Sequence, residues 1–470
     1  MEGSRSLEIV VVGAGLGGLA AAVALSGSGH QVTVFEATKE LLTAGAGIQV
    51  PPPSTRILRS WGLEETLASK ITIPMTFAFR RYEDSRLLGA IPLNPFCEQR
   101  YGAPWWTIHR GDYQKVLFEE ALRRGASIKL DHRVIDVDLS KPTVTVQSSD
   151  KVETYEADLI IGADGLRSRI RTAFLGDTDP GLRPSSICAY RALVPLIAMN
   201  ANEQRKPFMD PTNTNVDVWL GSGHFILAYP VRSGPEAQYN LVLVHPEKDE
   251  HTRHDLPPRF PRPASVPEVS AHYVDFCPEV KSILSQVVGE DESEYWIEQA
   301  ALAPKDGILE WKLSDLDDLP TWSSADGTVI VIGDAAHAQR PYMSAGASTA
   351  VEDAVALAEF LKAEHLAQHG LKKLIDAFVS MRKPRTSKMQ RLSAADSACW
   401  SLERGPAQAR RDGLLVHLGD QDRQECARAM AQLKAEGIGE FNFGDADVMD
   451  WAWSYDVTEE AREVIKQLAW

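Results

Sequence analysis

Residues 8–18 read EIVVVGAGLGG, an apolar run followed at once by glycines at positions 13, 15 and 18. We predict a buried strand over Glu8–Val12 and a helix within Ala14–Ser28. In such a unit Gly13 permits the tight turn, Gly15 lets the backbone approach a pyrophosphate, and Gly18 lets helix and strand pack closely. The helix N-terminus adds N–H donors for the phosphates. The stretch therefore predicts a dinucleotide-binding α/β domain.

The next segment strengthens this interpretation. A second strand is expected over Gln31–Phe35, and it ends beside Glu36, 18 positions after Gly18. A carboxylate at this distance is placed to accept hydrogen bonds from a ribose. GxGxxG alone is weak evidence, and a glycine-rich turn without a ligand is the alternative. The order strand, glycines, helix, strand and acid favours a nucleotide, but it does not distinguish NAD from FAD.

The composition limits the partners. The chain has 470 residues, 44% hydrophobic and 24% charged, with a net charge of −16, which fits a globular protein of more than one domain. The acidic balance disfavours nucleic acids and anionic membranes. Five cysteines without a CxxC pair predict no disulfide framework, no bound metal and a reducing, cytoplasmic location. No apolar stretch reaches the roughly 20 residues needed for a transmembrane segment.

The middle of the chain changes character. Segments such as Asp217–Leu220, Phe225–Val231 and Tyr239–Val244 contain β-formers separated by Gly, Asn and Pro, which predicts an antiparallel sheet in a separate layer. After Val351 the pattern is helical to the C-terminus, and Pro384 is expected to interrupt or kink a long helix.

Two further motifs decide the cofactor. After strands predicted at Leu159–Ile161 and Thr328–Ile332, residues 162–171 read GADGLRSRIR and residues 333–337 read GDAAH. With these motifs the sequence resembles the group A flavoprotein monooxygenases, both salicylate hydroxylase-like and 4-hydroxybenzoate hydroxylase-like, and most closely the fungal salicylate hydroxylase-like members. The resemblance covers nearly the whole chain. It also includes Gly45–Gln49, His109–Asp112, Tyr190–Arg191, Tyr229–Pro230, Glu352–Ala354, Arg382–Arg385 and Trp451–Asp456.

This resemblance implies an α/β fold in which a Rossmann-like FAD-binding domain carries an inserted, mostly antiparallel β-sheet substrate domain and a C-terminal helical region. The expected divisions are 1–186 for the first part of the FAD-binding domain, with substrate-pocket segments around 64–108; 187–298 for the substrate-binding sheet; 299–370 for the second part of the FAD-binding domain, with the GD motif; and 371–470 for the helical region.

The resemblance also implies roles in binding FAD. Asp334 would accept hydrogen bonds from the ribityl hydroxyls, and Arg110 would neutralise the pyrophosphate or contact the ribityl chain. Gly47, in the Gly45–Gln49 segment, is a further cofactor-binding candidate. Gly346 and Ala347 would open a helix whose N–H groups face the flavin edge on which reduced flavin carries negative charge.

The second nucleotide is expected to visit only transiently. Asp164 and Gly165 belong to a motif that the family links to both FAD and NAD(P)H. A second GxGxxG domain is absent from the sequence, and the resembling enzymes use NAD(P)H as a transient co-substrate without one.

The implied reaction is hydroxylation of an aromatic or phenolic small molecule by O2 through a flavin C4a-hydroperoxide, so no catalytic triad is expected. Arg191 and Tyr229 match positions from which related hydroxylases point side chains at the substrate. Arginine would stabilise phenolate charge and tyrosine would orient the substrate or relay a proton; ion pairing and core packing are the alternatives. Pro341 would form a wall near the reactive edge of the flavin. His224 is a further candidate, with a satisfied strand histidine as the alternative.

Two departures from the family pattern lie near the expected reaction site. Ala345 stands where many salicylate hydroxylase-like members have glutamine, and Arg340 precedes Pro341 where small or apolar residues are usual. Arg340 would favour an anionic substrate or fix a loop. The substrate therefore stays open: an aromatic compound such as a salicylate-type acid, a secondary-metabolism substrate for epoxidation or dearomatising hydroxylation, or none, in a flavin-binding scaffold without turnover.

Some properties are not determined by the sequence. It does not choose between NADH and NADPH or between a monomer and a homodimer. The Pro-rich stretch 256–267 reads as an exposed loop without an assigned role.

Overall fold

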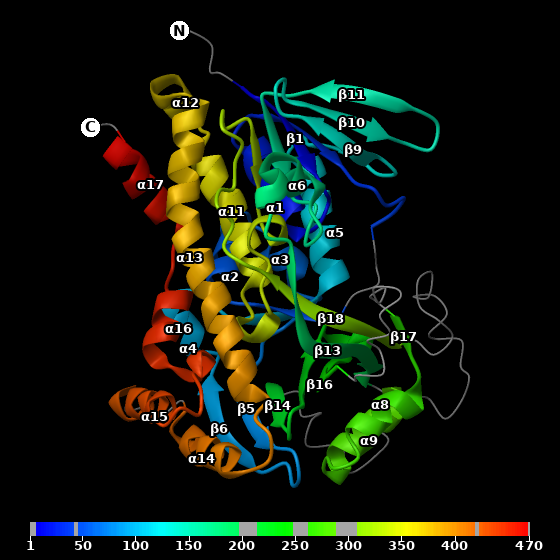
Figure 1. Ribbon diagram of the computed structural model, residues 1–470, viewed down its shortest axis with the longest axis vertical. Coiled ribbons are helices and arrows are strands. Elements are labelled where there is room, and N and C mark those ends of the chain that lie inside the picture. The colour runs from blue at the N-terminus through cyan, green and yellow to red at the C-terminus, as the bar shows by residue number, and fades with distance from the viewer. Residues whose placement is uncertain are drawn as a thin grey trace.

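The computed structural model describes residues 6–41, 46–196, 214–247, 262–287, 308–418 and 423–468. One layer is a parallel sheet with the strand order β19-β12-β1-β2-β8, of which β1 is labelled in Figure 1. Its strands are β19 (Val329–Val331), β12 (Leu159–Gly162), β1 (Glu8–Val12), β2 (Gln31–Phe35) and β8 (Ser127–Lys129). The central strand β1 is buried from Ile9 to Val12, as expected for a strand covered on both faces, which requires a continuous apolar run. The predicted α/β fold class is confirmed.

Three helices pack together beside this sheet. They are α1 (Leu16–Gly27), α5 (Arg110–Arg123) and α11 (Gly346–Phe360), and α1 contacts both of the others. The α1 segment is rich in glycine and alanine, and its residues from Gly18 to Leu25 are buried. Small side chains let α11 approach α1 closely, so the N-terminal ends of both helices come to one region.

The second large sheet has eight strands in the order β17-β18-β13-β16-β15-β14-β5-β6. Its pairs are antiparallel except for β14 with β5. The strands are β17 (Arg262–Ala264), β18 (Ile308–Leu316), β13 (Leu182–Pro195), β16 (Gln238–Pro246), β15 (Phe225–Val231), β14 (Asn215–Leu220), β5 (Thr76–Arg81) and β6 (Leu87–Pro92). The sheet thus combines the expected range 187–298 with strands from both flanking ranges, and the domain boundaries stay a prediction.

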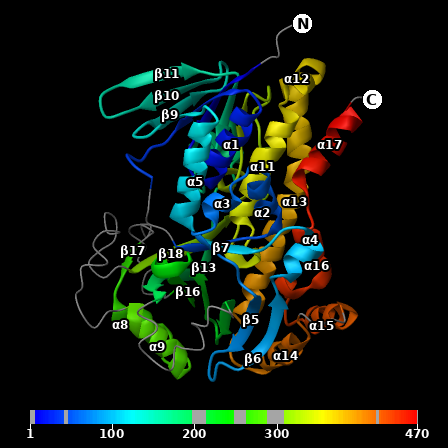
Figure 2. The same ribbon diagram turned by 180° about the vertical axis from the view of Figure 1, so that it is seen from behind.

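The two faces of this sheet have different neighbours. One face, with Tyr190, Ile226 and Leu243, packs in a hydrophobic cluster with α8 (Val266–His272) and α9 (Pro278–Val287). The other face carries the alternate residues of the same strands. Helices α8 and α9 lie at the opposite end of the molecule from a small sheet of β9 (Arg133–Asp138), β10 (Thr143–Gln147) and β11 (Val152–Glu156) (Figure 2).

Smaller elements complete the fold. Two three-stranded sheets have the orders β3-β7-β4 and β11-β10-β9. Their strands are β3 (Gly47–Val50), β7 (Trp106–His109), β4 (Ile71–Thr72), β9 (Arg133–Asp138), β10 (Thr143–Gln147) and β11 (Val152–Glu156). The shorter helices are α2 (Pro52–Ser60), α3 (Glu64–Leu67), α4 (Phe96–Tyr101), α6 (Arg169–Leu175), α10 (Asp334–His337), α12 (Ala363–His369) and the 3₁₀ turn η6 (Pro341–Met343).

The long helix α13 (Leu371–Trp400) connects the two layers, and it runs most of the length of the molecule (Figure 1). Its first part packs into the core of the parallel sheet through Leu374 and Phe378, and Trp400 at its end packs into the core beneath the eight-stranded sheet. Pro384 lies inside this helix, so of the two expected effects the interruption is wrong, and the kink stays a prediction. The helix continues because packing on both sides of Pro384 offsets the lost backbone hydrogen bond.

The remaining helices follow α13: α14 (Pro406–Leu414), α15 (Arg423–Ala435), α16 (Ala446–Trp453) and α17 (Val457–Leu468), of which α17 packs on α11 and α13. In the part of the chain that the structure describes, no helix is both long and apolar enough to cross a membrane. Of the Pro-rich stretch, residues 256–261 lie outside the described residues. Its second half forms β17 and the start of α8, so there the expected loop is wrong.

Candidate active site

A cavity of about 370 Å³ is lined by residues of the eight-stranded sheet, of β3 and of the segments that follow strands of the parallel sheet. The predicted site residues that line it are Gly15, Gly47, Arg110, Gly165, Arg191, Tyr229, Asp334, Pro341, Gly346 and Ala347. The predicted residues Gly13, Gly18, Glu36 and Asp164 are absent from its wall. The structure thus brings together segments more than 300 positions apart in the sequence.

The glycine turn before α1 forms one end of the cavity. Gly13 has φ +103°, a conformation that favours glycine, and a Cβ on Gly18 would lie 2.0 Å from the Gly13 carbonyl oxygen. Around Gly15, by contrast, a Cβ would meet no protein atom within 4 Å. Since Gly15 lines the cavity and precedes the first residue of α1, the N–H groups of that helix start are open to an anionic ligand.

Glu36 supports this turn from behind. Its carboxylate accepts hydrogen bonds from the Ala14 N–H at 2.8 Å and from the N–H and hydroxyl of Thr38, both at 2.9 Å. Each carboxylate oxygen retains further acceptor capacity, so the contact with a ribose stays a prediction. The observed bonds fix the backbone around Gly15.

Asp164 holds the turn between β12 and α6 by hydrogen bonds, as Glu36 holds the turn before α1. Its carboxylate accepts hydrogen bonds from the Ser168 hydroxyl at 2.5 Å and from the backbone N–H groups of Arg169 and Ile170 at 2.7 and 3.3 Å. These groups stand at the start of α6, where unpaired N–H groups need acceptors. Gly165, with φ +76°, reaches the cavity, as does Ala163 of the same motif. The cofactor-binding role expected for Asp164 stays a prediction.

Opposite charges face each other farther along the cavity. The Arg110 guanidinium, at the start of α5, forms no hydrogen bond or ion pair with the residues that the structure describes. Burial lowers the pKa of Arg110, while the charges of Asp334 and Glu36 raise it. Asp334 follows Gly333 (φ +59°), and its side chain is open to the cavity. Enclosure by the protein raises the pKa of Asp334, and His337 and Arg110 oppose that shift.

A second helix start faces the same cavity. Helix α11 begins at Gly346, and Ala345 before it offers no side chain that caps the first N–H groups. Gly346 and Ala347 line the cavity, so these donors and the positive end of the helix dipole are directed at its contents. These features fit FAD. The start of α1 beside Gly15 and the Arg110 guanidinium suit its phosphates, the Asp334 carboxylate suits its ribityl chain, and the start of α11 suits its flavin ring.

The eight-stranded sheet supplies the end of the cavity at which the sequence predicts the substrate. Leu227 of β15, Val242 of β16 and Arg191 of β13 are paired side by side, and directly paired residues share a face. Tyr229 lies two positions beyond Leu227 and therefore on that face too. All four residues line the cavity. The side chains of Arg191 and Tyr229 have no hydrogen-bond partner among the described residues.

The two residues influence each other electrostatically. Burial raises the pKa of the Tyr229 hydroxyl, and the positive charge of Arg191 opposes the shift. Burial lowers the pKa of Arg191, Tyr229 opposes this, and the like charge of Arg110 adds to it. Gly47 makes room for the tyrosine, because a Cβ on Gly47 would lie 2.7 Å from Tyr229 Cε2.

An aromatic wall at this end was not predicted from the sequence. Phe225, Tyr342 and Trp400 line the cavity, with ring centroids 5.4 to 5.6 Å apart. Phe225 could have been found, because it alternates with Leu227 and Tyr229 in the period-two pattern of one strand face. Trp400 comes from the end of α13, and no local pattern distinguishes it from a core residue.

Two sequence hypotheses change with the structure. The Arg340 side chain lines the cavity but pairs with Asp315, with Nε 3.0 Å from Oδ2, and donates from Nη1 to the Ser397 hydroxyl at 3.3 Å. These contacts favour the loop-fixing hypothesis for Arg340. His224 lies outside the cavity lining, and its Nδ1 is 2.5 Å from the Ser222 carbonyl oxygen, which favours the structural alternative. Among the described residues no group of three or more His, Cys, Asp or Glu side chains could hold a metal ion.

Comparison with known proteins agrees with this geometry. The chain matches the protein family described as "FAD binding domain" over residues 6–242 and 310–393. It is 30% identical to FAD-dependent monooxygenase OpS4 of Beauveria bassiana, over 86% of this chain and 88% of that protein. It is 31% identical to 6-hydroxynicotinate 3-monooxygenase of Pseudomonas fluorescens, over 83% and 91%.

The fold has a solved counterpart. A salicylate hydroxylase substrate complex superposes with a TM-score of 0.70 at 24% identity, covering 98% of both chains. The predicted resemblance to flavoprotein monooxygenases is confirmed. The chain belongs to the FAD-dependent monooxygenases that are built on this FAD-binding domain.

Proposed function

We propose that this protein hydroxylates an aromatic or phenolic small molecule, with NAD(P)H and O2 as co-substrates. The observation that carries the proposal is the pair Arg191 and Tyr229, which face one cavity together with the start of α11. In the balanced reaction a substrate C–H becomes C–OH, O2 supplies that oxygen, the second oxygen leaves as water, and NAD(P)H with one proton supplies two electrons. FAD, when bound, supplies the electron transfer and oxygen activation.

The substrate end of the cavity is suited to an electron-rich ring. Arg191 supplies a guanidinium that would stabilise negative charge on a substrate oxygen, and the Tyr229 hydroxyl would orient that oxygen or relay its proton. Asp334 is the carboxylate among the lining residues, and it belongs to the cofactor end. The rings of Phe225, Tyr342 and Trp400 would pack against the substrate and exclude water.

The other end of the cavity would hold FAD. The start of α1, with Gly15 at the cavity and Gly13 and Gly18 shaping the turn, would receive the pyrophosphate with Arg110. Asp334 would accept hydrogen bonds from the ribityl hydroxyls, and Glu36 would accept them from the ribose. Gly346 and Ala347 would face the flavin edge, and Pro341 would wall the reaction site.

Several finer features are proposed with the function. Asp164 and Gly165 would contribute to the transient NAD(P)H site, and the chain would divide at the predicted domain boundaries. All five cysteines are buried and free, which supports a reducing compartment such as the cytoplasm. A homodimer supported by the C-terminal helical region is a further proposal, with a monomer in which that region only covers the core as the alternative.

The test is NAD(P)H consumption by the FAD-loaded protein across matched phenolic acids, neutral phenols and polyketide aromatics, with mass analysis of the products. Substrate-stimulated oxidation with a product heavier by one oxygen, or hydroxylated with loss of carboxyl, supports the proposal. An epoxide or a dearomatised product would assign the alternative chemistry. Oxidation that no aromatic compound stimulates would overturn the proposal.

A further inference from the structure

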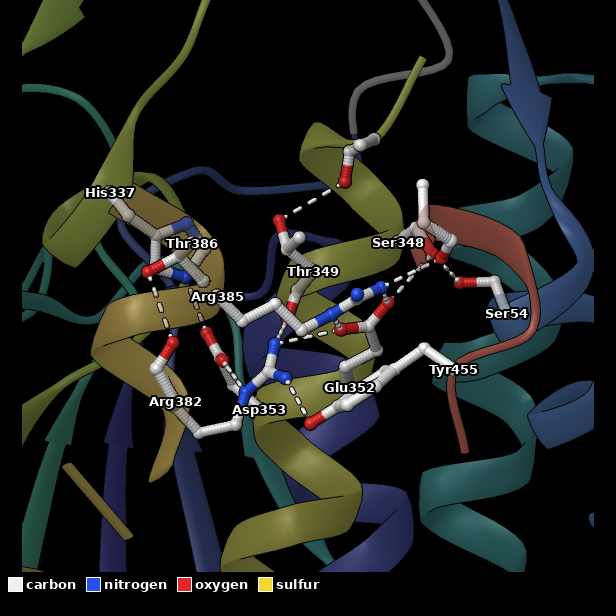
Figure 3. Close-up of polar contacts among 12 residues, drawn as sticks. Ser54, His337, Ser348, Thr349, Glu352, Asp353, Arg382, Arg385, Thr386 and Tyr455 are labelled. Carbon is white, nitrogen blue, oxygen red and sulfur yellow. Dashed lines mark hydrogen bonds and ion pairs between the residues drawn. The ribbon is translucent and has the colours of Figure 1, made fainter. Parts of the chain in front are cut away.

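Four charged side chains lie buried outside the cavity wall. They are Glu352 and Asp353 of α11 and Arg382 and Arg385 of α13 (Figure 3). Their side chains are between 0% and 6% exposed. Buried charges are costly to desolvate and are tolerated only when each has its partners, so their arrangement needs a reason.

Asp353 contacts the turn that carries the cavity carboxylate. Its Oδ2 accepts a hydrogen bond from the Gly333 N–H at 3.0 Å and lies 2.6 Å from His337 Nε2. These two residues flank Asp334, which lines the cavity. Because Asp353 itself belongs to α11, one carboxylate ties the 333–337 turn to the helix whose first residues line the same cavity.

Arg382 continues this connection. It donates from Nε to Asp353 Oδ1 at 2.8 Å, from Nη2 to Glu352 Oε2 at 2.9 Å and from Nη1 to the Tyr455 hydroxyl at 3.0 Å. Arg385 stacks on the Tyr455 ring, with its Cζ 3.6 Å from the centroid. The same carboxylates that border the cofactor elements therefore also fasten the C-terminal segment around Tyr455.

We propose that Asp353 is a positioning residue for FAD. It holds the 333–337 turn and the start of α11 at the separation that binds the flavin, and Arg382 and Tyr455 extend that restraint to the C-terminal segment. The inference rests on FAD binding, which the proposed function also needs, and not on the identity of the substrate.

The experiment measures the dissociation constant of FAD for the deflavinated full-length chain, wild type and Asp353→Asn, by titration of flavin fluorescence. An asparagine keeps the shape but cannot accept from Gly333, His337 and Arg382 as a carboxylate does. We expect FAD binding weakened at least tenfold. The matched control is Glu359→Gln, on the same helix: Glu359 pairs with Lys362 and Arg462 and has no contact with the turn, so binding should change less than twofold.

A double-mutant cycle of Asp353→Asn and His337→Gln, measured as FAD affinity, distinguishes positioning of the 333–337 turn from a general loss of stability. If both residues act through the turn, the double variant loses no more FAD affinity than Asp353→Asn alone, whereas independent effects add. If Asp353→Asn does not fold, Tyr455→Phe takes its place, because it keeps the aromatic ring and removes only the hydroxyl that accepts from Arg382. It should weaken FAD binding about threefold.

The outcomes are distinguishable. Wild-type affinity in Asp353→Asn, or a loss equal to that in Glu359→Gln, overturns the inference while leaving the proposed function intact. Additive losses in the cycle overturn it as well, and so does unchanged affinity in Tyr455→Phe where that variant stands in. A wild-type chain that does not bind FAD would instead overturn the proposed function.

Discussion

The Arg340 guanidinium pairs with the carboxylate of Asp315, Nε to Oδ2 at 3.0 Å, and the Asp315 side chain is 4% exposed. Arg340 is the residue before Pro341, at the cavity wall, whereas Asp315 is absent from that wall. An arginine that looks like a substrate-binding residue in the sequence therefore has a protein partner that fixes the segment leading into η6.

This pairing predicts that Arg340→Ala and Asp315→Asn have similar effects. Each should lower the free energy of unfolding by about 1–3 kcal/mol. Arg340→Ala removes one of the two arginines that pair with the buried Asp315 carboxylate, and Asp315→Asn removes the charge with which Arg340 and Arg183 pair. The KM for the substrate should change by a similar factor in Arg340→Ala and in Asp315→Asn. Chemical denaturation and steady-state kinetics test this; a large rise in KM for an anionic substrate in Arg340→Ala alone would restore the substrate-binding role.

The pair Arg191 and Tyr229 predicts a loss of turnover. Arg191→Met and Tyr229→Phe should each lower kcat/KM for the hydroxylated substrate by about 100-fold, because each removes a group that the proposed function places against the substrate oxygen. FAD affinity should be retained.

Tyr239→Phe is the matched control for this pair. Tyr239 is buried among the residues of the face that packs on α8 and α9, so removal of its hydroxyl should leave kcat/KM unchanged. Normal turnover in Tyr229→Phe would assign Tyr229 to packing alone.

The glycines of the first turn should separate folding from cofactor binding. Alanine at Gly15 meets no protein atom, so Gly15→Ala should fold with wild-type thermal stability without FAD yet bind FAD at least tenfold more weakly. Alanine at Gly18 would place Cβ 2.0 Å from the Gly13 carbonyl oxygen, so Gly18→Ala should lower the melting temperature of the apoprotein. Thermal melts with and without FAD measure both; equal FAD affinity in Gly15→Ala and wild type would contradict the site.

The buried ion cluster predicts acid sensitivity. Burial alone would raise the pKa of Glu352, but Arg385 and Arg382 hold it below its ordinary 4.5. Burial likewise raises the pKa of Asp353, but His337 and Arg382 hold it below its ordinary 3.8. Since these folded-state values lie below the unfolded ones, the stabilisation is present above the ordinary values and is lost as the pH falls through them toward the folded values.

Denaturation between pH 3 and 7 measures this effect. Glu352→Gln should cost about 3–5 kcal/mol at pH 7, because two buried arginines lose a partner. It should also show a shallower loss of stability on acidification than the wild type. If the free energy of unfolding of Glu352→Gln falls with decreasing pH as steeply as that of the wild type, Glu352 does not contribute to the acid sensitivity.

The sequence predicted the elements that rest on local pattern. Glu8–Val12 and Gln31–Phe35 are strands over the predicted residues; in the first, a continuous apolar run that ends at a glycine specifies a buried parallel strand. Gly13 was assigned to the tight turn, and its φ of +103° agrees, since the need for a positive φ is a local property.

Partners distant in the sequence were not predictable in this way. Nothing near Arg340 indicates Asp315, because the two meet only when the segment before η6 packs beside β18, where the Leu316 N–H donates to the Ala338 carbonyl oxygen. Trp400 reaches the cavity because α13 continues past Pro384, which a local proline rule does not anticipate. The motif containing Asp353 was recognised, but its contact with the 333–337 turn depends on how α11 packs.

The most direct test of the proposed hydroxylation is the reaction of the FAD-loaded protein with NAD(P)H, ¹⁸O2 and the aromatic panel, followed by mass analysis of the product. We expect oxidation of NAD(P)H that an aromatic substrate stimulates and one ¹⁸O atom in the hydroxylated product. Stimulated oxidation that yields a product without ¹⁸O, or no stimulation by any aromatic compound, would contradict it.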